Sequence, residues 1–277
     1  MPKELSLRAP AKINLVLHVL FRREDGYHEL YTIFQKVTFF DEIRLRPAPR
    51  INLRVRGEIE VPEGEENLCW RAAKLFFAAL GRSHGVEIIL DKHLPKGAGL
   101  GGGSSDAAAV LKGLNELYPS FSPEELLSLG QKLGADVPFF LSPYSTALAR
   151  GIGEILSPWP THPAWYLILC PEIEISTAWA YHNLRLTTRR EPPNYEPDQP
   201  LWEQGLVNDF EPVIFSRYPV LKELKEELLR AGAQAALLSG SGAALFGVFL
   251  TEEEARAAQK LFRKKGLRAV VVTNFLA

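Results

Sequence analysis

One stretch decides how this chain folds, the glycine-rich run LPKGAGLGGGSSD at residues 94–106. Five of the seven residues from Gly97 to Gly103 are glycines, so the main chain there can adopt positive φ angles and approach a ligand closely. A strand pattern precedes the run at residues 86–90, and a helical pattern follows at 107–117. Backbone N–H groups at a helix start attract anions. The run therefore predicts a phosphate-binding loop that enters a helix, with Ser104 or Ser105 as the helix N-cap.

Other kinds of glycine-rich loop fit this sequence less well. A flexible linker would have polar, low-complexity flanks, whereas this run lies between two apolar segments. A dinucleotide-binding fold needs a second strand after the helix, but a second helical pattern follows at residues 123–133. The nucleoside-triphosphatase loop ends in Gly-Lys-Ser/Thr, whereas Gly103 is followed by two serines. The protein-kinase strings H-R-D and D-F-G do not occur in the chain.

Composition limits the function classes. The chain has 277 residues, of which 46% are hydrophobic, enough for one large core or two moderate ones. A net charge of −1 gives no electrostatic footprint for nucleic acid or for an anionic membrane. Cys69 and Cys170 are far apart, so neither a disulfide framework nor a zinc site is indicated. Without an N-terminal signal pattern or an apolar span of membrane length, we expect a cytosolic protein.

The order of the predicted elements is that of an α+β protein. The first part shows strand patterns that alternate like antiparallel strands, at residues 12–20, 31–40, 43–46 and 51–56, and then a helix at 65–80. The second part shows strands at 166–170, 235–238, 244–249 and 267–272, and helices around Trp179 and at 211–229 and 252–265. A polar, Pro-rich stretch at 187–200 predicts a surface loop. The run SPWP at 157–160 indicates a boundary between domains at residues 1–157 and 158–277.

The glycine-rich run resembles the phosphate loop of the GHMP superfamily, which contains galactokinase, homoserine kinase, mevalonate kinase and phosphomevalonate kinase. The stretches APAKINL at 9–15 with GYHEL at 26–30, and GADVPFF at 134–140, narrow the resemblance to the 4-diphosphocytidyl-2-C-methyl-D-erythritol kinases, and LSGSGA at 238–243 resembles the third motif of the superfamily. The resemblance implies a ribosomal-S5-like N-terminal domain and a ferredoxin-like C-terminal domain with the active site between them. It also implies ATP-dependent phosphorylation of the substrate's 2-hydroxyl group, a step of the non-mevalonate route to isoprenoid precursors.

Two polar residues of the first strand and one aspartate are candidates for catalysis. Strand periodicity places Lys12 and Asn14 on one face, where they serve either a shared site or the solvent-facing side of an amphipathic strand. Asp136 precedes Pro138 by two residues, which also fits a helix N-cap. The resemblance implies that Lys12 and Asp136 are catalytic, with Asp136 as the base, and that Asn14 lies near the accepting hydroxyl.

The resemblance also assigns residues that bind the two substrates. Aromatic and histidine side chains suit a nucleobase, because rings stack on it and ring nitrogens read its edge. The block at 239–242 also fits a plain strand-to-strand turn. The implied ATP site consists of Asn67 and Leu68 beside adenine and of Pro95, Lys96, Gly97, Ala98, Gly99, Leu100, Gly101, Gly102, Gly103, Ser104 and Ser105. The implied site of the cytidylyl substrate consists of Asn14, Tyr27, His28, Thr177, Tyr181, Gly240 and Ser241.

Phosphoryl chemistry requires a cation on the β- and γ-phosphates, so we expect Mg²⁺. Ser104 or Ser105 can reach either a phosphate or the Mg²⁺, and no carboxylate ligand is identified. The closest alternative is another small-alcohol kinase of the superfamily, acting on homoserine or mevalonate. A non-catalytic RNA-binding module is an alternative of another class, which the near-neutral charge opposes. The sequence leaves open whether the protein is a monomer or a homodimer.

Overall fold

The computed structural model describes residues 4–81, 84–186 and 188–276. Its contacts divide the chain into two compact units. The first unit comprises Met1–Ala11, Phe39–Lys96 and Gly101–Pro143, and the second comprises Lys12–Thr38, Gly97–Leu100 and Tyr144–Ala277. Both units are discontinuous, because the strands β1 (Leu5–Arg22) and β2 (His28–Ala48) each supply residues to both. The domain boundary between residues 157 and 158 stays a prediction. Both of these residues lie in one strand, β6 (Ile155–Pro158).

In the first unit, the end of β2 pairs with β4 (Gly85–Asp91), and β4 pairs with β3 (Asn52–Arg56). The pairing of β2 with β4 is antiparallel. The pairing of β3 with β4 is parallel, so the antiparallel expectation for residues 51–56 is wrong. The physical reason is the connection between them, which contains helix α1 (Leu68–Leu80) and forms a crossover instead of a hairpin.

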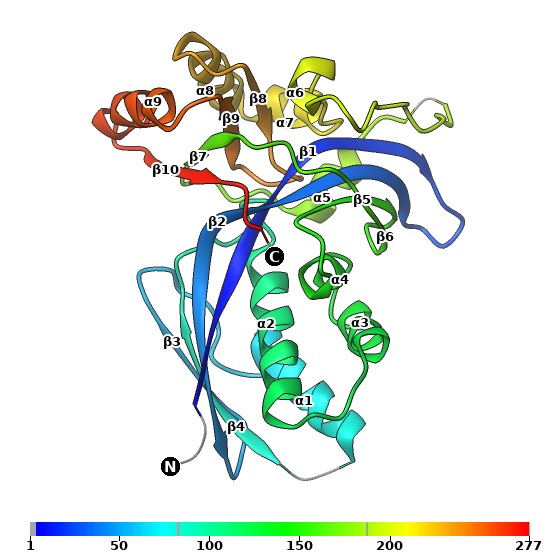
Figure 1. Cartoon of the computed structure of the whole chain (residues 1–277). Helices are drawn as coiled ribbons and strands as arrows, with labels where there is room; N and C mark the ends of the chain where they lie inside the picture. Colours follow the sequence, from blue (N-terminus) through cyan, green and yellow to red (C-terminus); the bar gives the residue numbers. More distant parts are fainter. Residues whose placement is uncertain (1–3, 82–83, 187, 277) are drawn as a thin grey trace. The chain divides into compact units, whose positions relative to one another are not determined.

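The helices of the first unit pack on one another (Figure 1). Helix α1 contacts α2 (Gly102–Leu117), and α2 contacts α3 (Pro123–Gln131) and α4 (Val137–Leu141). Asn67 caps α1 by accepting a hydrogen bond from the N–H of Cys69, and Ser122 and Glu125 form a capping box at the start of α3. Ala107, Ala108 and Ala109 of α2 are buried, so the helix that follows the glycine-rich run is a core element of this unit.

The second unit contains two sheet regions. The start of β2 pairs with β5 (Thr146–Gly151), which pairs with β6, both antiparallel. A four-stranded antiparallel sheet has the order β10-β7-β9-β8, from β7 (Trp165–Cys170), β8 (Ala235–Leu238), β9 (Leu245–Phe249) and β10 (Arg268–Thr273). The helices of this unit are α5 (Thr177–Asn183), α6 (Leu201–Gln204), α7 (Glu211–Arg217), α8 (Pro219–Arg230) and α9 (Glu252–Lys264). The predicted α+β class is confirmed.

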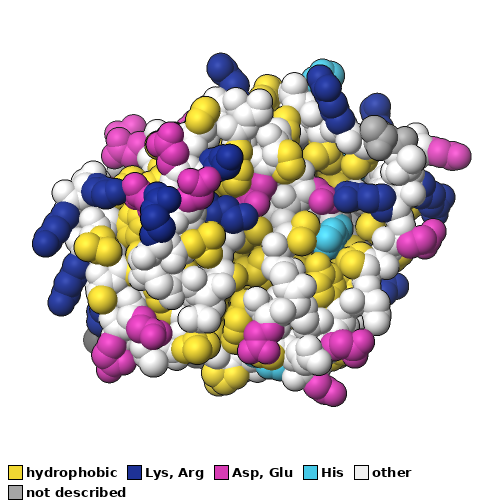
Figure 2. All heavy atoms as spheres, turned by 90° about the horizontal axis from the view of Figure 1, so that it is seen from above, with side chains coloured by type: hydrophobic (Ala, Val, Ile, Leu, Met, Phe, Trp, Pro, Cys, Tyr) yellow, Lys and Arg dark blue, Asp and Glu magenta, His cyan; other side chains and the backbone are white. Residues whose placement is uncertain are grey.

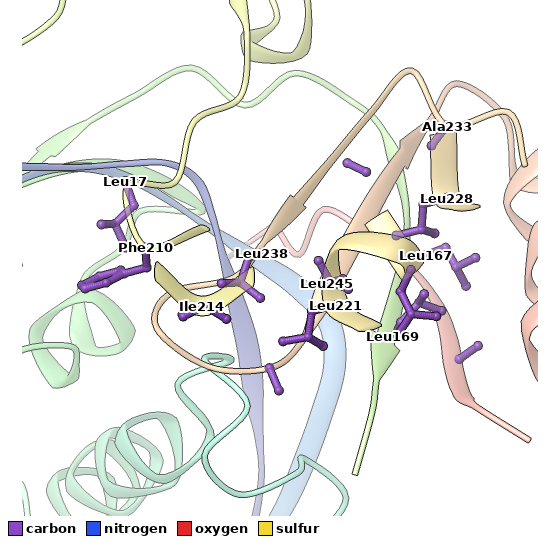
Figure 3. Close-up of a cluster of buried hydrophobic side chains, with 14 of the residues drawn as sticks. Leu17, Leu167, Leu169, Phe210, Ile214, Leu221, Leu228, Ala233, Leu238 and Leu245 are labelled. Carbon is purple, nitrogen blue, oxygen red and sulfur yellow. The ribbon is translucent and has the colours of Figure 1, made fainter. Parts of the chain in front are cut away.

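One hydrophobic core joins the four-stranded sheet to helices α5, α7, α8 and α9 (Figure 3). Leu167 and Leu169 of β7, Ile214 of α7 and Leu221 of α8 are among its buried members. The mainly helical stretch predicted at residues 211–229 consists of two helices, because Pro219 begins α8 and the preceding residue, Tyr218, has non-helical backbone angles (φ −128°, ψ 74°). Within the described ranges, no helix has the length and apolarity needed to cross a membrane.

Candidate functional site

The glycine-rich loop has alternating left-handed residues. Gly97, Gly99 and Gly101 have φ angles of 66°, 78° and 70°, which residues with a side chain rarely adopt. Helix α2 begins at Gly102, with Gly101 as its N-cap, so the prediction that Ser104 or Ser105 caps the helix is wrong. The N–H of Ser105 donates to the carbonyl of Gly101 (2.9 Å), which makes it the first intrahelical bond of α2. The N–H groups before it have no acceptor within the helix and suit a phosphate.

In the first unit, the stems of this loop meet in a buried charged cluster of Asp41, Lys92 and Asp106. The Lys92 ammonium donates to the carboxylates of Asp41 and, at 2.7 Å, of Asp106. All three residues are at most 4% exposed. Asp41 also accepts the backbone N–H groups of His93 (2.5 Å) and Leu94 (2.8 Å). The cluster therefore ties the exit of β4 to the first turns of α2.

Burial and charge compete within this cluster. Burial, opposed by the charge of Lys92 and reinforced by the Asp41 carboxylate, raises the pKa of Asp106 to about 8. Burial alone would lower the pKa of Lys92, but the two carboxylates outweigh it and raise this pKa. Lys92 thus keeps its proton and its charge at neutral pH. Lys92 is therefore a charged lysine buried between two aspartates.

Two side-chain oxygens at the start of α2 have no hydrogen-bond partner in the described chain, Ser105 Oγ and Asp106 Oδ1. Ser105 is 1% exposed. Burying a hydroxyl without a partner is unfavourable, so this oxygen is available to a ligand. Among the described residues, no group of three or more His, Cys, Asp or Glu side chains could hold a metal ion.

In the second unit, the tip of the loop lies against the turn between β8 and β9. Ser239 Oγ donates to the carbonyl of Gly99 at 3.0 Å, and the N–H of Ala244 donates to the carbonyl of Ala98 at 3.1 Å. A Cβ atom on Gly99 would lie 1.9 Å from the carbonyl oxygen of Ser239, and one on Gly242 would lie 2.1 Å from the nitrogen of Gly99. The two backbones are in direct contact, and glycine is required at both positions.

Lys12 and Asn14 also lie beside the loop tip. The N–H of Lys12 donates to the carbonyl of Leu100 (2.9 Å), and its ammonium donates to Asn14 Oδ1 (2.7 Å). Asn14 donates in turn to the hydroxyl of Thr32 at 2.8 Å. Lys12 and Asn14 are 4% and 1% exposed, which rejects the solvent-facing alternative for this strand face. Their shared face is confirmed, and both side chains are fixed by neighbours.

An aromatic group forms around α5. The rings of His28 and Tyr181 are 4.9 Å apart between centroids, and Phe210 packs edge-on against Tyr181 at 4.8 Å. Burial lowers the pKa of His28, and Arg22 lowers it further, so the imidazole is neutral at pH 7 with one donor and one acceptor nitrogen. Tyr27 is 59% exposed. The structure thus brings His28 and Tyr181 together and leaves the Tyr27 ring largely open to solvent.

The remaining predicted residues are placed as follows. Asp136 is the N-cap residue of α4, as the alternative reading predicts, although its side chain makes no capping hydrogen bond. Leu68 lies beside the start of α2, since a Cβ atom on Gly103 would be 3.4 Å from it. The Asn67 side chain caps α1 and donates to the carbonyl of Pro62. The hydroxyls of Thr177 and Ser241 are hydrogen-bonded at 3.0 Å.

Comparisons with known proteins agree with this arrangement. The family model of the GHMP kinases N terminal domain matches residues 67–143, and that of the GHMP kinases C terminal domain matches residues 195–266. The 4-diphosphocytidyl-2-C-methyl-D-erythritol kinase of Geobacter metallireducens is 48% identical over 262 residues, covering 92% of this chain and 93% of that protein. The kinase of the same name from Syntrophotalea carbinolica is 44% identical, covering 96% and 98%. The chain belongs to this kinase family.

Solved structures extend the comparison. A crystal structure of 4-(cytidine 5'-diphospho)-2C-methyl-D-erythritol kinase is 40% identical to this chain with a TM-score of 0.82, covering 97% of this chain and 98% of that one. A homoserine kinase from Cytophaga hutchinsonii is 20% identical with a TM-score of 0.68, covering 99% and 95%, and shows the shared GHMP kinase fold alone. The resemblance stated from the motifs is confirmed.

Several residues that organise these sites were not found from the sequence. Lys92 and Asp41 are 51 residues apart, and no local pattern indicates their pairing. Asn208 and Phe210 lie in the run NDFE, four residues with hydrogen-bonding or aromatic side chains at a helix start. Residues 188–200, the described part of the predicted surface loop, form no helix or strand, and two of their side chains bond to β1: Arg190 donates to the carbonyl of Val19, and Tyr195 is hydrogen-bonded to His18 at 2.8 Å. The one sequence signal for these missed residues is a polar run that adjoins an aromatic residue, as in NDFE.

Proposed function

We propose that this chain transfers the γ-phosphoryl group of ATP to the 2-hydroxyl of 4-diphosphocytidyl-2-C-methyl-D-erythritol, giving the 2-phosphate and ADP in the non-mevalonate pathway of isoprenoid precursor biosynthesis. Its relatives at 43–48% identity bear the name of that kinase. The three left-handed glycines and the open start of α2 supply backbone donors for a triphosphate.

The observation that carries the choice of substrate is the pair of rings from His28 and Tyr181 (4.9 Å). A base gains about 1–3 kcal/mol by stacking on an aromatic face, and a neutral imidazole can read its edge. Tyr27, exposed on the neighbouring turn, is then the second face of the cytosine site. Homoserine and mevalonate contain no base, so neither would use these rings.

The catalytic roles follow from the chemistry of the side chains. A carboxylate is too weak a base to ionise an alcohol in advance, so the hydroxyl proton leaves with or after the transfer, and Asp136 mainly orients the hydroxyl. Lys12, whose ammonium is fixed by Asn14, offsets negative charge on the γ-phosphoryl group. Asn14 lies near the accepting hydroxyl. Gly240 and Ser241 face the substrate phosphates.

The residues present fit Mg²⁺. When bound, Mg²⁺ neutralises the β- and γ-phosphate oxygens, and the phosphates themselves supply most of its ligands. Ser105 Oγ, buried and without a partner in the described chain, is the protein oxygen that would hold it. The absence of a three-carboxylate cluster among the described residues suits a cation held mainly by substrate.

The test uses purified protein, ATP labelled in the γ position, and three acceptors: the cytidylyl alcohol, homoserine and mevalonate. Label transferred to the cytidylyl alcohol alone is the expected result. Transfer to homoserine or mevalonate without transfer to the cytidylyl alcohol would reject the proposed substrate.

A matched variant tests the role of Asp136. Asp136→Asn keeps the size of the side chain and removes its charge, so kcat should fall about 10²–10⁴-fold while the KM for ATP changes little. Steady-state kinetics with each substrate varied in turn gives both constants. An unchanged kcat would remove Asp136 from the mechanism.

Charge distribution opposes the RNA-binding alternative. Figure 2 shows one face of the molecule, on which Lys and Arg side chains are interspersed with Asp and Glu side chains and with hydrophobic ones. The net charge of the chain is −1. A nucleic-acid site requires basic side chains gathered on one face.

A further inference from the structure

Asn208 is a buried amide whose side-chain hydrogen bonds within the described chain all go to main-chain atoms. It is 3% exposed. Its Nδ2 donates to the carbonyls of Leu238 (2.8 Å) and Gly240 (2.7 Å), and its Oδ1 accepts the N–H of Phe210 (2.9 Å). Both amide hydrogens thus hold the end of β8 and the turn that follows it.

The backbone around Asn208 is itself fixed to β1. Asn208 forms a parallel bridge with Leu17, whose N–H donates to the carbonyl of Val207 and whose carbonyl accepts from Asp209. Glu211 extends the same support, because its carboxylate accepts the N–H of Leu238 at 3.0 Å. The run NDFE at 208–211 therefore connects β1 to the β8–β9 turn.

That turn sets the position of the glycine loop. Gly99 and Ser239 are in backbone contact, with no room for a methyl group between them. A Cβ atom on Gly240 would lie 3.3 Å from the carbonyl oxygen of Gly99 and 3.4 Å from Asn14 Oδ1. A displacement of Gly240 would therefore move the loop tip and the Lys12–Asn14 pair together.

We propose that Asn208 is a positioning residue of the kinase, which holds the β8–β9 turn so that the tip of the glycine loop and Asn14 keep their binding geometry. The proposal rests on the proposed function of that loop in ATP binding. Asn208 itself contacts neither substrate in this role. A shift of about 1 Å in a positioned group can cost about 100-fold in rate.

The test compares two buried amides of the same unit. Asn208→Leu removes the donor from the carbonyls of Leu238 and Gly240. Gln259→Leu is the matched control, because Gln259 is 8% exposed and its amide donates to the carbonyl of Ala269, between α9 and β10. Asn208→Asp is the second variant, which keeps the acceptor for Phe210 and removes both donors.

Steady-state kinetics with ATP varied, ADP binding by calorimetry, and urea denaturation are measured on all four proteins. We expect Asn208→Leu and Asn208→Asp to lower kcat/KM for ATP about 100-fold and to weaken ADP binding, while Gln259→Leu stays within about twofold at a comparable loss of stability. The stability measurement separates displacement of the loop from unfolding.

Either of two results would overturn the proposal. One is a folded Asn208 variant whose kcat/KM and ADP affinity match those of the unaltered chain. The other is a loss in Gln259→Leu equal to that in the Asn208 variants. If Asn208→Leu does not fold, the kcat/KM for ATP and the ADP affinity of Asn208→Asp decide whether the proposal holds. If the unaltered chain transfers no phosphoryl group, the proposed function fails, and ADP binding by the same variants still decides the role of Asn208.

Discussion

The glycine loop has two supports of opposite chemistry. In the first unit its stems are held by buried charges, because Asp41 accepts two backbone N–H groups and pairs with Lys92. In the second unit its tip rests on a turn held by a neutral amide, that of Asn208. A buried charge that loses its partner is far more costly than a buried carbonyl that loses one donor. The charged support therefore governs stability, and the neutral support governs the fine geometry of the loop tip.

The largest expected effect tests the charged support. Lys92→Met removes the cation from the buried pair of Asp41 and Asp106, so the free energy of unfolding should fall by about 3–5 kcal/mol. Urea denaturation followed by circular dichroism measures it. Lys112→Met is the matched control on α2, because the ammonium of Lys112 donates to one carbonyl, that of Phe140. A loss in Lys92→Met no larger than in Lys112→Met would break the comparison.

The second prediction tests the contact at the loop tip. Gly99→Ala places a methyl group 1.9 Å from the Ser239 oxygen at a φ of 78°, so kcat/KM for ATP should fall about 100-fold or more. Gly97→Ala is the control, because its φ is 66° but a Cβ atom there meets nothing within 4 Å. Kinetics with ATP varied should show the smaller loss in Gly97→Ala. Equal losses would mean that backbone strain, and not the contact with Ser239, sets the effect.

The third prediction follows the neutral support to the aromatic pair, since Phe210, bonded to Asn208, packs on Tyr181. Tyr181→Leu should raise the KM for the cytidylyl substrate about 10-fold, the equivalent of about 1–2 kcal/mol of stacking, with little change for ATP. Tyr27→Ala should act in the same direction. Steady-state kinetics with each substrate varied in turn gives the KM for the cytidylyl substrate and the KM for ATP separately. A rise confined to the KM for ATP would contradict the assignment of these rings.

The smallest expected effect concerns pH. Burial lowers the pKa of His18, Arg190 also lowers it, and Asp209 opposes the shift. Because the folded-state pKa is below the usual 6.5, the unfolded chain takes up the proton first, and this contribution to stability is present above pH 6.5 and lost as the pH falls. Unfolding free energies at pH 7.5 and 5.5 should therefore differ less in His18→Gln than in the unaltered chain. An equal difference would show that His18 does not titrate differently on folding.

Local patterns predicted most of the elements and the residues of the loop. The glycine run, the helix that follows it and the α+β order are properties of neighbouring residues, and the structure has them. The shared face of Lys12 and Asn14 follows from the period of a strand, and their hydrogen bond confirms it. The roles of Asp136, Tyr27 and the other assigned residues stay predictions.

What the sequence alone determined is the set of local conformations: where glycine permits positive φ, where proline ends a helix, and which faces are apolar. What only the tertiary structure decided is which distant polar groups meet, such as Ser239 with Gly99, 140 residues away, and Lys92 with Asp41. The parallel pairing of β3 with β4 is another feature that only the tertiary structure decided. The physical reason is that a buried polar group must find a partner, and folding selects that partner by position in space, which no neighbouring residue specifies.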